Sequence, residues 1–278
     1  MAGRALVLGG GGVTGDAWEL GILGGLAKAG LDLTDADLVV GTSAGSVVGA
    51  LVAGGTPVEE LYQGQLLPPT SEQSARLGLG TILKLASASL GSIDAQRARA
   101  KIGAMALAAK TIPEEERRAI IKSRLVHNDW PARRLLITTV AADDGEFVVF
   151  DRDAGVSLVD AVGASCAVPG VWPPVTINGR RYIDGGMRAP ANVDLAAGYE
   201  RVVVIAPIST AFRRGSRVSA QVAALPAGTR SVVIVPDLKA TRAIGRNVLD
   251  PQRRAPAAQA GRVQATDVLA AVRAVWEG

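Results

Sequence analysis

The 278 residues are 48% hydrophobic but only 4% aromatic, so the chain can bury a substantial core of small aliphatic side chains. The formal net charge of +4 is small for this length, and we expect no nucleic-acid partner. Cys166 is the only cysteine and His127 the only histidine, which excludes an intrachain disulfide and a metal site built on several thiolates or imidazoles.

The opening sequence, MAGRALVLGGGG, has a short apolar run and no charged leader, which predicts a first β-strand rather than a signal peptide. No uninterrupted apolar segment reaches the roughly 18–20 residues that a membrane-spanning helix requires. The nearest is residues 46–55. We therefore expect a cytoplasmic protein, and its mildly basic character leaves peripheral contact with a membrane open.

The first third of the chain contains a strand–turn–helix pattern twice. An expected strand at 4–8 is broken by glycines 9–12 and followed by a helix at about 16–29, whose apolar side includes Trp18. A second apolar run at 38–40 leads through residues 41–45 into a helix of small residues at 46–53. This repetition is typical of parallel strands, and it predicts a three-layer α/β/α sandwich with a mostly parallel central sheet.

Residues 57–130 have little strand-like pattern and predict a helical insertion that forms a cap beside the active site. After it, hairpins are expected around Asp143-Asp144-Gly145 and around Asn178-Gly179. The other expected elements are a helix at 157–164, strands at 201–205 and 231–235, and a basic helical tail at 237–278. No repeat or long linker divides the chain, so residues 1–278 are expected to form a single domain.

The segment Gly41-Thr42-Ser43-Ala44-Gly45 matches the nucleophile elbow pattern, G-x-S-x-G. In an elbow, a sharp strand-to-helix turn forces the serine into a strained conformation that exposes its Oγ, and flanking glycines leave room for the turn. The expected strand before Ser43 and the apolar helix after it provide this context. A serine that merely caps a helix is the alternative.

The glycines at 9–12 could supply backbone donors for acyl transfer. A tetrahedral intermediate needs about two N–H groups that converge on its oxyanion, and glycines let a substrate approach the main chain. Gly10, Gly11 and Gly12 are the candidate oxyanion-hole residues.

A nucleotide site is a competing hypothesis for the same loop. Gly10, Gly12 and Gly15 also satisfy G-x-G-x-x-G directly after a first strand, and Asp32 or Asp35 could be the acidic partner. A run of four glycines satisfies many glycine patterns, so this match is weak.

Asp184-Gly185-Gly186 follows an expected strand and places a carboxylate at a strand end. A Ser-His-Asp hydrolase of the α/β-hydrolase type needs a histidine after its acid, whereas His127 precedes Asp184 in a polar segment. Ser43 therefore needs another base, and a carboxylate is the simplest choice. Because an ordinary carboxyl pKa of about 4 makes a feeble base, Asp184 is expected to be partly desolvated.

In combination, the glycine loop, the elbow and the Asp-Gly-Gly motif resemble the patatin-like phospholipase family, in the same order and with comparable spacing. Residues 164–174, ASCAVPGVWPP, also resemble the family's approach to its aspartate, and the resemblance covers roughly residues 4–208. It implies a Ser–Asp dyad at Ser43 and Asp184, an oxyanion hole in the glycine loop, and a three-layer fold. It also implies hydrolysis of lipid acyl esters without a metal or other cofactor.

One position departs from the family pattern, because Thr14 stands where a basic residue is usual. The motifs therefore predict hydrolysis of an ester more firmly than they predict a phosphate headgroup on the substrate. Tail arginines could supply a membrane-facing patch instead: Arg242, Arg246, Arg253, Arg254, Arg262 and Arg273. The motifs leave open acyl transfer to an acceptor other than water, a catalytically silent lipid-binding role, and the oligomeric state.

Overall fold

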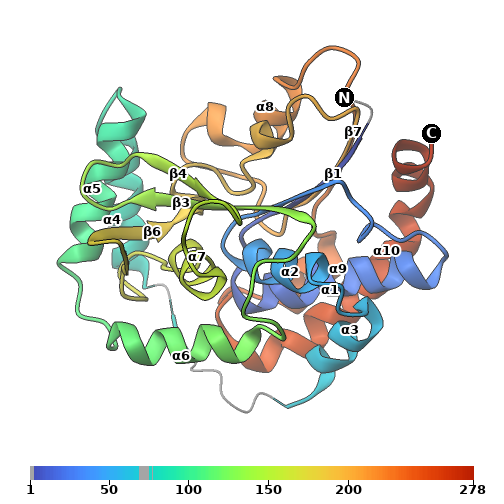
Figure 1. Ribbon diagram of the computed structural model, residues 1–278, viewed down its shortest axis with the longest axis horizontal. Helices are drawn as coiled ribbons and strands as arrows, with labels where there is room; N and C mark the ends of the chain where they lie inside the picture. Colours follow the sequence, from blue (N-terminus) through green and yellow to red (C-terminus); the bar gives the residue numbers. More distant parts are fainter. Residues whose placement is uncertain (1–2, 69–74, 77) are drawn as a thin grey trace.

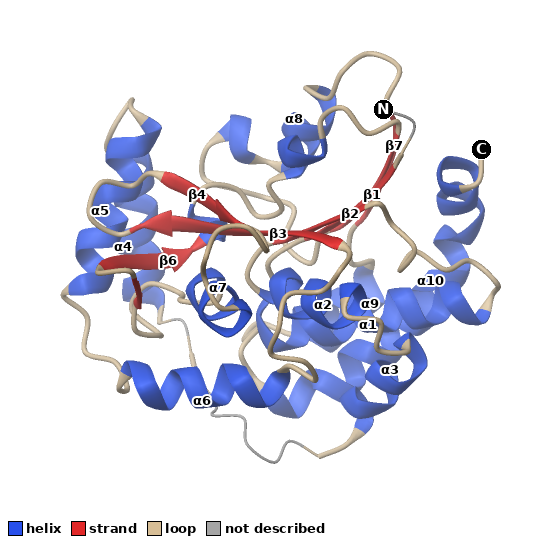
Figure 2. Ribbon diagram, viewed as in Figure 1, coloured by secondary structure: helices blue, strands red, loops and turns tan. Residues whose placement is uncertain are grey.

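The computed structural model describes residues 3–68, 75–76 and 78–278. Eight strands in this part of the chain form one mixed sheet with helices on both faces (Figure 1, Figure 2). The strands lie in the order β5-β6-β3-β2-β1-β7-β8, and β4 also pairs with β3. Their bounds are β1 (Arg4–Leu8), β2 (Leu38–Gly41), β3 (Arg134–Ala141), β4 (Phe147–Phe150), β5 (Val175–Ile177), β6 (Arg180–Asp184), β7 (Arg201–Ile205) and β8 (Arg230–Ile234).

Strands β3, β2, β1, β7 and β8 are parallel neighbours, and the other three strands join antiparallel at one end. Side chains alternate along β1, where Leu6 and Leu8 enter one core cluster and Ala5 and Val7 enter the other. The predicted α/β/α class with a mostly parallel sheet is confirmed.

Both predicted hairpins are present. Gly145 has a φ of 74° in the β3–β4 turn, and Asn178 and Gly179 have φ values of 50° and 80° between β5 and β6. Two successive residues with positive φ match the right-handed twist of the flanking strands, which is why Asn-Gly is a strong hairpin signal.

The thicker helical layer covers one face of the sheet (Figure 1). Its helices are α1 (Gly12–Lys28), α2 (Ala44–Ala53), α7 (Leu158–Ser165), α9 (Leu238–Ile244) and α10 (Arg254–Trp276). Two helices start earlier than predicted: α1 begins at Gly12 rather than about residue 16, and α2 at Ala44 rather than 46. The φ of 60° at Gly12 turns the chain from the glycine loop directly into α1.

Helix α10 packs closely along α1. A Cβ at Gly21 would lie 2.1 Å from the carbonyl oxygen of Ala258, so the two backbones are almost in contact. The indole Nε1 of Trp18 donates a hydrogen bond of 3.0 Å to Gln264 across the same interface. The segment predicted as a basic tail therefore belongs to the core layer.

Several arginines of this segment are engaged within the molecule. Arg262 forms an ion pair with Glu59 at 2.8 Å, and Arg273 forms one with Glu277 at 2.8 Å. Arg254 donates hydrogen bonds to Gln65 and to the carbonyl of residue 64. These contacts leave less of the charge for a membrane-facing patch than the sequence indicated.

A thinner layer covers the opposite face, with α8 (Val218–Ala223) and the 3₁₀ helix η2 (Val193–Ala196). Val193 and Val218 pack there against the second core cluster, which includes Val7, Val40 and Val204. Three more 3₁₀ helices are η1 (Gly185–Met187), η3 (Arg214–Ser216) and η4 (Pro251–Arg253).

The segment predicted as one helical cap divides among three places. Helix α3 (Val58–Leu66) packs on α1 and α10, and α6 (Glu114–Arg124) packs on α7. Only α4 (Leu79–Leu90) and α5 (Ala95–Leu107) pair with each other at the antiparallel end of the sheet, where α5 contacts β3 and β6. Residues 69–74 and 77 of the predicted cap lie outside the described residues. No helix within the described ranges is long and apolar enough to cross a bilayer.

Candidate active site

The glycine loop follows β1 at the point where the strand order reverses. One neighbour of β1 is β2 and the other is β7, so the connections after β1 and β7 leave the sheet side by side. The amide of Gly9 donates to the carbonyl of Ile205 at 2.9 Å, which joins the loop to the end of β7. Parallel sheets bind ligands at such a switch point, beyond the carboxyl ends of the strands.

Ser43 lies in the turn between β2 and α2. Its φ of 53° and ψ of −119° belong to a region that residues with a Cβ rarely adopt. The amide of Gly45 donates to the carbonyl of Thr42 at 2.9 Å, which closes the turn, and to the carbonyl of Gly9 at 2.9 Å, which joins the turn to the glycine loop. A Cβ at Gly45 would lie 2.2 Å from the carbonyl oxygen of Leu8, so only glycine fits there. This turn has the geometry of a nucleophile elbow, with Ser43 immediately before the N-terminus of α2.

Ser43 and Asp184, 141 positions apart, meet at the end of the sheet. Strand β2 runs parallel to β3 and ends with Gly41 opposite Ile137. Strand β6 runs antiparallel to β3 and ends with Asp184 opposite Thr139. The Ser43 hydroxyl donates a hydrogen bond of 2.7 Å to Asp184 Oδ2.

Asp184 is nearly inaccessible, with 2% of its surface exposed. Burial raises the pKa of its carboxyl group from the ordinary 3.8 to about 7, although the hydrogen bonds from the Ser43 hydroxyl and the Gly186 amide oppose this rise. The Gly186 amide donates to Oδ1 at 2.7 Å and holds the carboxyl group in orientation. Asp184 is therefore a stronger base than an exposed aspartate when it is ionised.

The three predicted oxyanion amides differ in their contacts. The amide of Gly10, a candidate oxyanion donor, already donates to the carbonyl of Pro190 at 2.8 Å. Within the described part of the chain, no hydrogen bond from the amide of Gly11 or Gly12 is found. Both amides lie at the N-terminal end of α1, where the first N–H groups have no intrahelical acceptor. A Cβ built on Gly10 would be 3.4 Å from the Cβ of Ser43, which places the loop against the serine.

A buried polar network that the sequence analysis missed supports the elbow. The amide of Ser43 donates to Ser165 Oγ at 2.8 Å. Asn192, at a positive φ of 50°, donates to Thr42 Oγ1 at 3.0 Å, and Thr138 donates to the same oxygen at 2.9 Å. Ser165 lies in the segment 164–174 that carried part of the family resemblance, whereas no local pattern singles out Asn192.

Three further side chains with possible chemical roles are those of Cys166, His127 and Thr14. Burial raises the pKa of the Cys166 thiol to about 12, and the thiol donates to the carbonyl of Ser43 at 3.3 Å. His127 is exposed on the loop after α6, beside Gly54. Thr14 is fully buried, and its hydroxyl and amide both donate to the carbonyl of Val248 at 3.2 Å. Neither His127 nor Thr14 lines the cavity over Ser43.

The nucleotide-site hypothesis loses its acidic partner. Asp32 and Asp35 precede β2 and so lie at the amino ends of the parallel strands, whereas the glycine loop lies at their carboxyl ends. Asp35 forms an ion pair with Arg4 at the start of β1. A dinucleotide fingerprint requires the acid near the carboxyl ends of the strands, where the ribose would lie.

A cavity of about 470 Å³ opens over Ser43 and Asp184. Most of its wall is apolar and comes from α4, α5 and the segments that follow β7 and α9. These residues include Ile82, Leu85, Ala98, Ile102, Ile208, Ala211, Phe212, Val248 and Leu249. Gly10, Gly11 and Gly12 also line the cavity, and Gly10 lies against Ser43. Among the described residues, no group of three or more His, Cys, Asp or Glu side chains is placed to hold a metal ion.

Comparison with known proteins identifies one family. The family model described as patatin-like phospholipase matches residues 6–197, which is more than half of the chain. Among solved structures, VipD from Legionella pneumophila is 14% identical with a TM-score of 0.49, over 98% of this chain and 67% of that one. The type III effector protein ExoU is 18% identical with a TM-score of 0.38, and the chain spans only 53% of it while 96% of the chain is covered. No curated protein matches the sequence.

Proposed function

Because the chain belongs to the patatin-like phospholipase family, we propose that it hydrolyses acyl esters of lipids with Ser43 as nucleophile and Asp184 as general base. The observation that carries the proposal is the hydrogen bond of 2.7 Å from the Ser43 hydroxyl to the buried Asp184 carboxylate, at the floor of a largely apolar cavity. The apolar walls suit an acyl chain, and the floor suits its ester group.

In the proposed reaction, Ser43 Oγ attacks the carbonyl carbon of the ester while its proton passes to Asp184 Oδ2. The amides of Gly11 and Gly12 stabilise the oxyanion, with help from the N-terminal end of α2. The tetrahedral intermediate expels the alcohol, which takes the proton from Asp184. Water then attacks the acyl-serine, gives its proton to Asp184, and the fatty acid leaves as Ser43 regains a proton.

The proposal predicts that an activity-based probe labels Ser43. A fluorophosphonate should modify the wild-type protein once and should not modify Ser43→Ala, because the probe needs an activated serine hydroxyl. The matched control is Ser87→Ala, which removes an exposed hydroxyl from α4 and should leave labelling unchanged. Labelling is measured by intact-mass spectrometry. If Ser43→Ala is labelled at the wild-type rate, the nucleophile lies elsewhere.

The proposal also predicts the pH dependence. Catalysis requires the ionised carboxylate, whose pKa burial raises to about 7. The value of kcat/KM should therefore rise about tenfold per pH unit below pH 7 and level off above it. An imidazole would give a similar profile, so the control is His127→Gln, which removes the only histidine of the chain. The same inflection should persist in this variant, and its disappearance would assign the base to His127.

A further inference from the structure

Three arginines line the cavity beside its apolar wall: Arg99 on α5, Arg188 after η1, and Arg213 before η3. Among the described residues that line the cavity, Asp184 is the only acid. A cavity of this kind carries an excess of positive charge, and such charges in a partly desolvated site are usually balanced by a partner. The three arginines differ in whether a protein group balances their charge.

Arg188 and Arg213 are held by protein groups. Arg188 makes two hydrogen bonds, of 2.6 and 2.8 Å, to the carboxylate of Asp194, and its guanidinium lies 4.1 Å from the centre of the Phe147 ring. Arg213 donates from all three of its guanidinium nitrogens to backbone carbonyl groups, that of Ser89 in the last turn of α4 and those of Ser92 and Ile93 in the loop after it.

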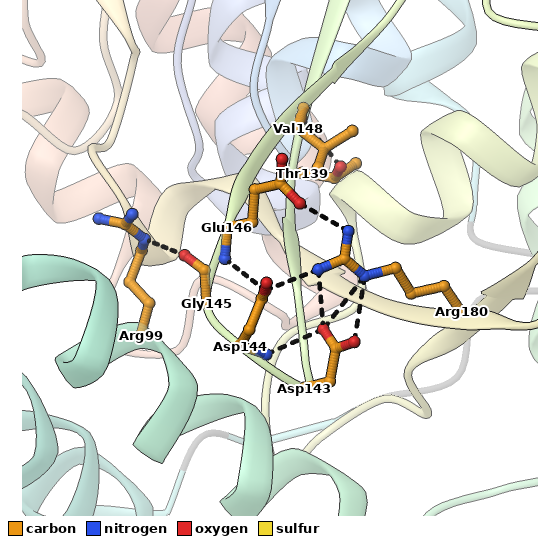
Figure 3. A network of polar contacts seen from close by, with 8 residues as sticks. All are labelled: Arg99, Thr139, Asp143, Asp144, Gly145, Glu146, Val148 and Arg180. Atoms are coloured by element: carbon orange, nitrogen blue, oxygen red, sulfur yellow. Dashed lines mark hydrogen bonds and ion pairs between the residues drawn. The ribbon is translucent and has the colours of Figure 1, made fainter.

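Arg99 is different, because only its Nε is engaged. This nitrogen donates to the carbonyl of Gly145 at 2.7 Å, in the turn between β3 and β4. In Figure 3 the two terminal nitrogens of Arg99 point away from the cluster of acids in and beside that turn. Within the described part of the chain, no hydrogen bond or ion pair from these terminal nitrogens is found.

The nearby acids are already neutralised by another arginine. Arg180 contacts three of them, at 3.1 Å for Asp143, 2.7 Å for Asp144 and 2.6 Å for Glu146 (Figure 3). Arg99 therefore lies beside an acidic turn whose carboxylates are committed to Arg180. Burial lowers the pKa of the Arg99 guanidinium, and the positive charge of Arg188 lowers it further. An anion beside the guanidinium would favour its charged form and so offset both effects.

We propose that the terminal nitrogens of Arg99 bind an anionic oxygen group of the phosphate class, carried by the substrate next to the ester that Ser43 attacks. Arg99 is then a specificity-determining residue that favours acidic lipids over neutral esters, and this inference rests on the proposed function. The planar guanidinium suits two oxygens of one phosphate, and the bond from Nε to Gly145 keeps its plane fixed.

The test compares two substrates with the same acyl chain, 1-oleoyl-lysophosphatidic acid and 1-oleoylglycerol. In Arg99→Gln, kcat/KM for the phosphate-bearing substrate should fall about 10- to 100-fold, mainly through KM, while the value for 1-oleoylglycerol stays within about twofold. Arg99→Lys keeps the charge but not the fork, and it should recover part of the loss. The matched control is Arg97→Gln, on the exposed side of the same helix, which should change neither value.

Inorganic phosphate, as an inhibitor of 1-oleoylglycerol hydrolysis, separates the two sources of the anion. If Arg99→Gln lowers kcat/KM for the phosphate-bearing lipid only, the anionic group belongs to the substrate. If the substitution weakens only the inhibition by inorganic phosphate, the site binds a free anion, and the inference about the lipid is overturned. Equal losses on both substrates in Arg99→Gln overturn the anion site. So does the absence of any loss on either substrate when inhibition by phosphate is also independent of Arg99. A wild-type protein that hydrolyses neither ester and is not labelled at Ser43 would instead refute the proposed function.

Discussion

Replacing Asp184 by Asn should lower kcat for ester hydrolysis by about 10³- to 10⁴-fold, because an amide cannot accept the proton of the Ser43 hydroxyl. The same substitution should make the folded protein more stable above pH 7. The buried carboxyl group has a pKa of about 7 in the folded protein against an ordinary 3.8, so the folded state binds the proton more tightly than the unfolded state.

The sign of the stability change follows from this difference. In the wild-type protein, ionisation of the buried Asp184 destabilises the folded state. This destabilisation is absent below about pH 4, grows as the pH rises, and reaches about 4 kcal/mol at and above pH 7. Asparagine has no charge to desolvate. Its Oδ1 can accept from the Gly186 amide while its Nδ2 donates to Ser43 Oγ, so Asp184→Asn should gain about 1–3 kcal/mol at pH 8 and little at pH 4. The buried Glu19 also has a raised pKa, so the difference between the two proteins, rather than the wild-type curve, isolates Asp184.

Chemical denaturation at pH 4 and pH 8, together with initial rates, measures both effects. The matched control is Asp153→Asn, which changes an exposed acid in the loop after β4 and should alter neither activity nor stability noticeably. An Asp184→Asn protein that retains wild-type kcat would exclude this carboxylate as the base. One that loses activity and also unfolds would point to a structural role for the charge.

Gly45→Ala should destabilise the fold by about 3 kcal/mol or more, the largest stability loss expected from a single added methyl group in the elbow. The new Cβ would lie 2.2 Å from the carbonyl oxygen and 2.7 Å from the Cβ of Leu8, on the central strand β1. No rotamer change can relieve a clash with backbone, so β1 or α2 must move. Because the amide of Gly45 also bonds to Gly9, that movement should disturb the glycine loop and reduce hydrolysis as well.

The matched control is Gly64→Ala in α3, where an added Cβ would meet nothing within 4 Å. Alanine is the better helix former, so this variant should be unchanged or more stable by up to about 1 kcal/mol, with unaltered activity. Equilibrium unfolding of the two variants measures the contrast. Equal stabilities would mean that the approach of α2 to β1 is looser than the structure indicates.

The sequence by itself determined the features that depend on neighbouring residues. The alternation of apolar runs, glycines and helices predicted β1, β2 and the parallel sheet, and Asn178-Gly179 predicted a hairpin. These predictions succeeded because strand periodicity and turn conformation arise from residues a few positions apart. The elbow around Ser43 could be predicted for the same reason, and with a single histidine in the wrong place a carboxylate was the remaining base.

Only the tertiary structure decided the features that depend on contacts between distant segments. The predicted basic tail forms helix α10, which packs on α1, and the amide of Gly10 donates to the carbonyl of Pro190. Burial raises the pKa of the Asp184 carboxyl group to about 7. The cations of the cavity came from Arg99, Arg188 and Arg213 rather than from position 14, where Thr14 is buried. Burial and charge pairing are sums over every segment that packs around a group, and no local pattern of residues carries that sum.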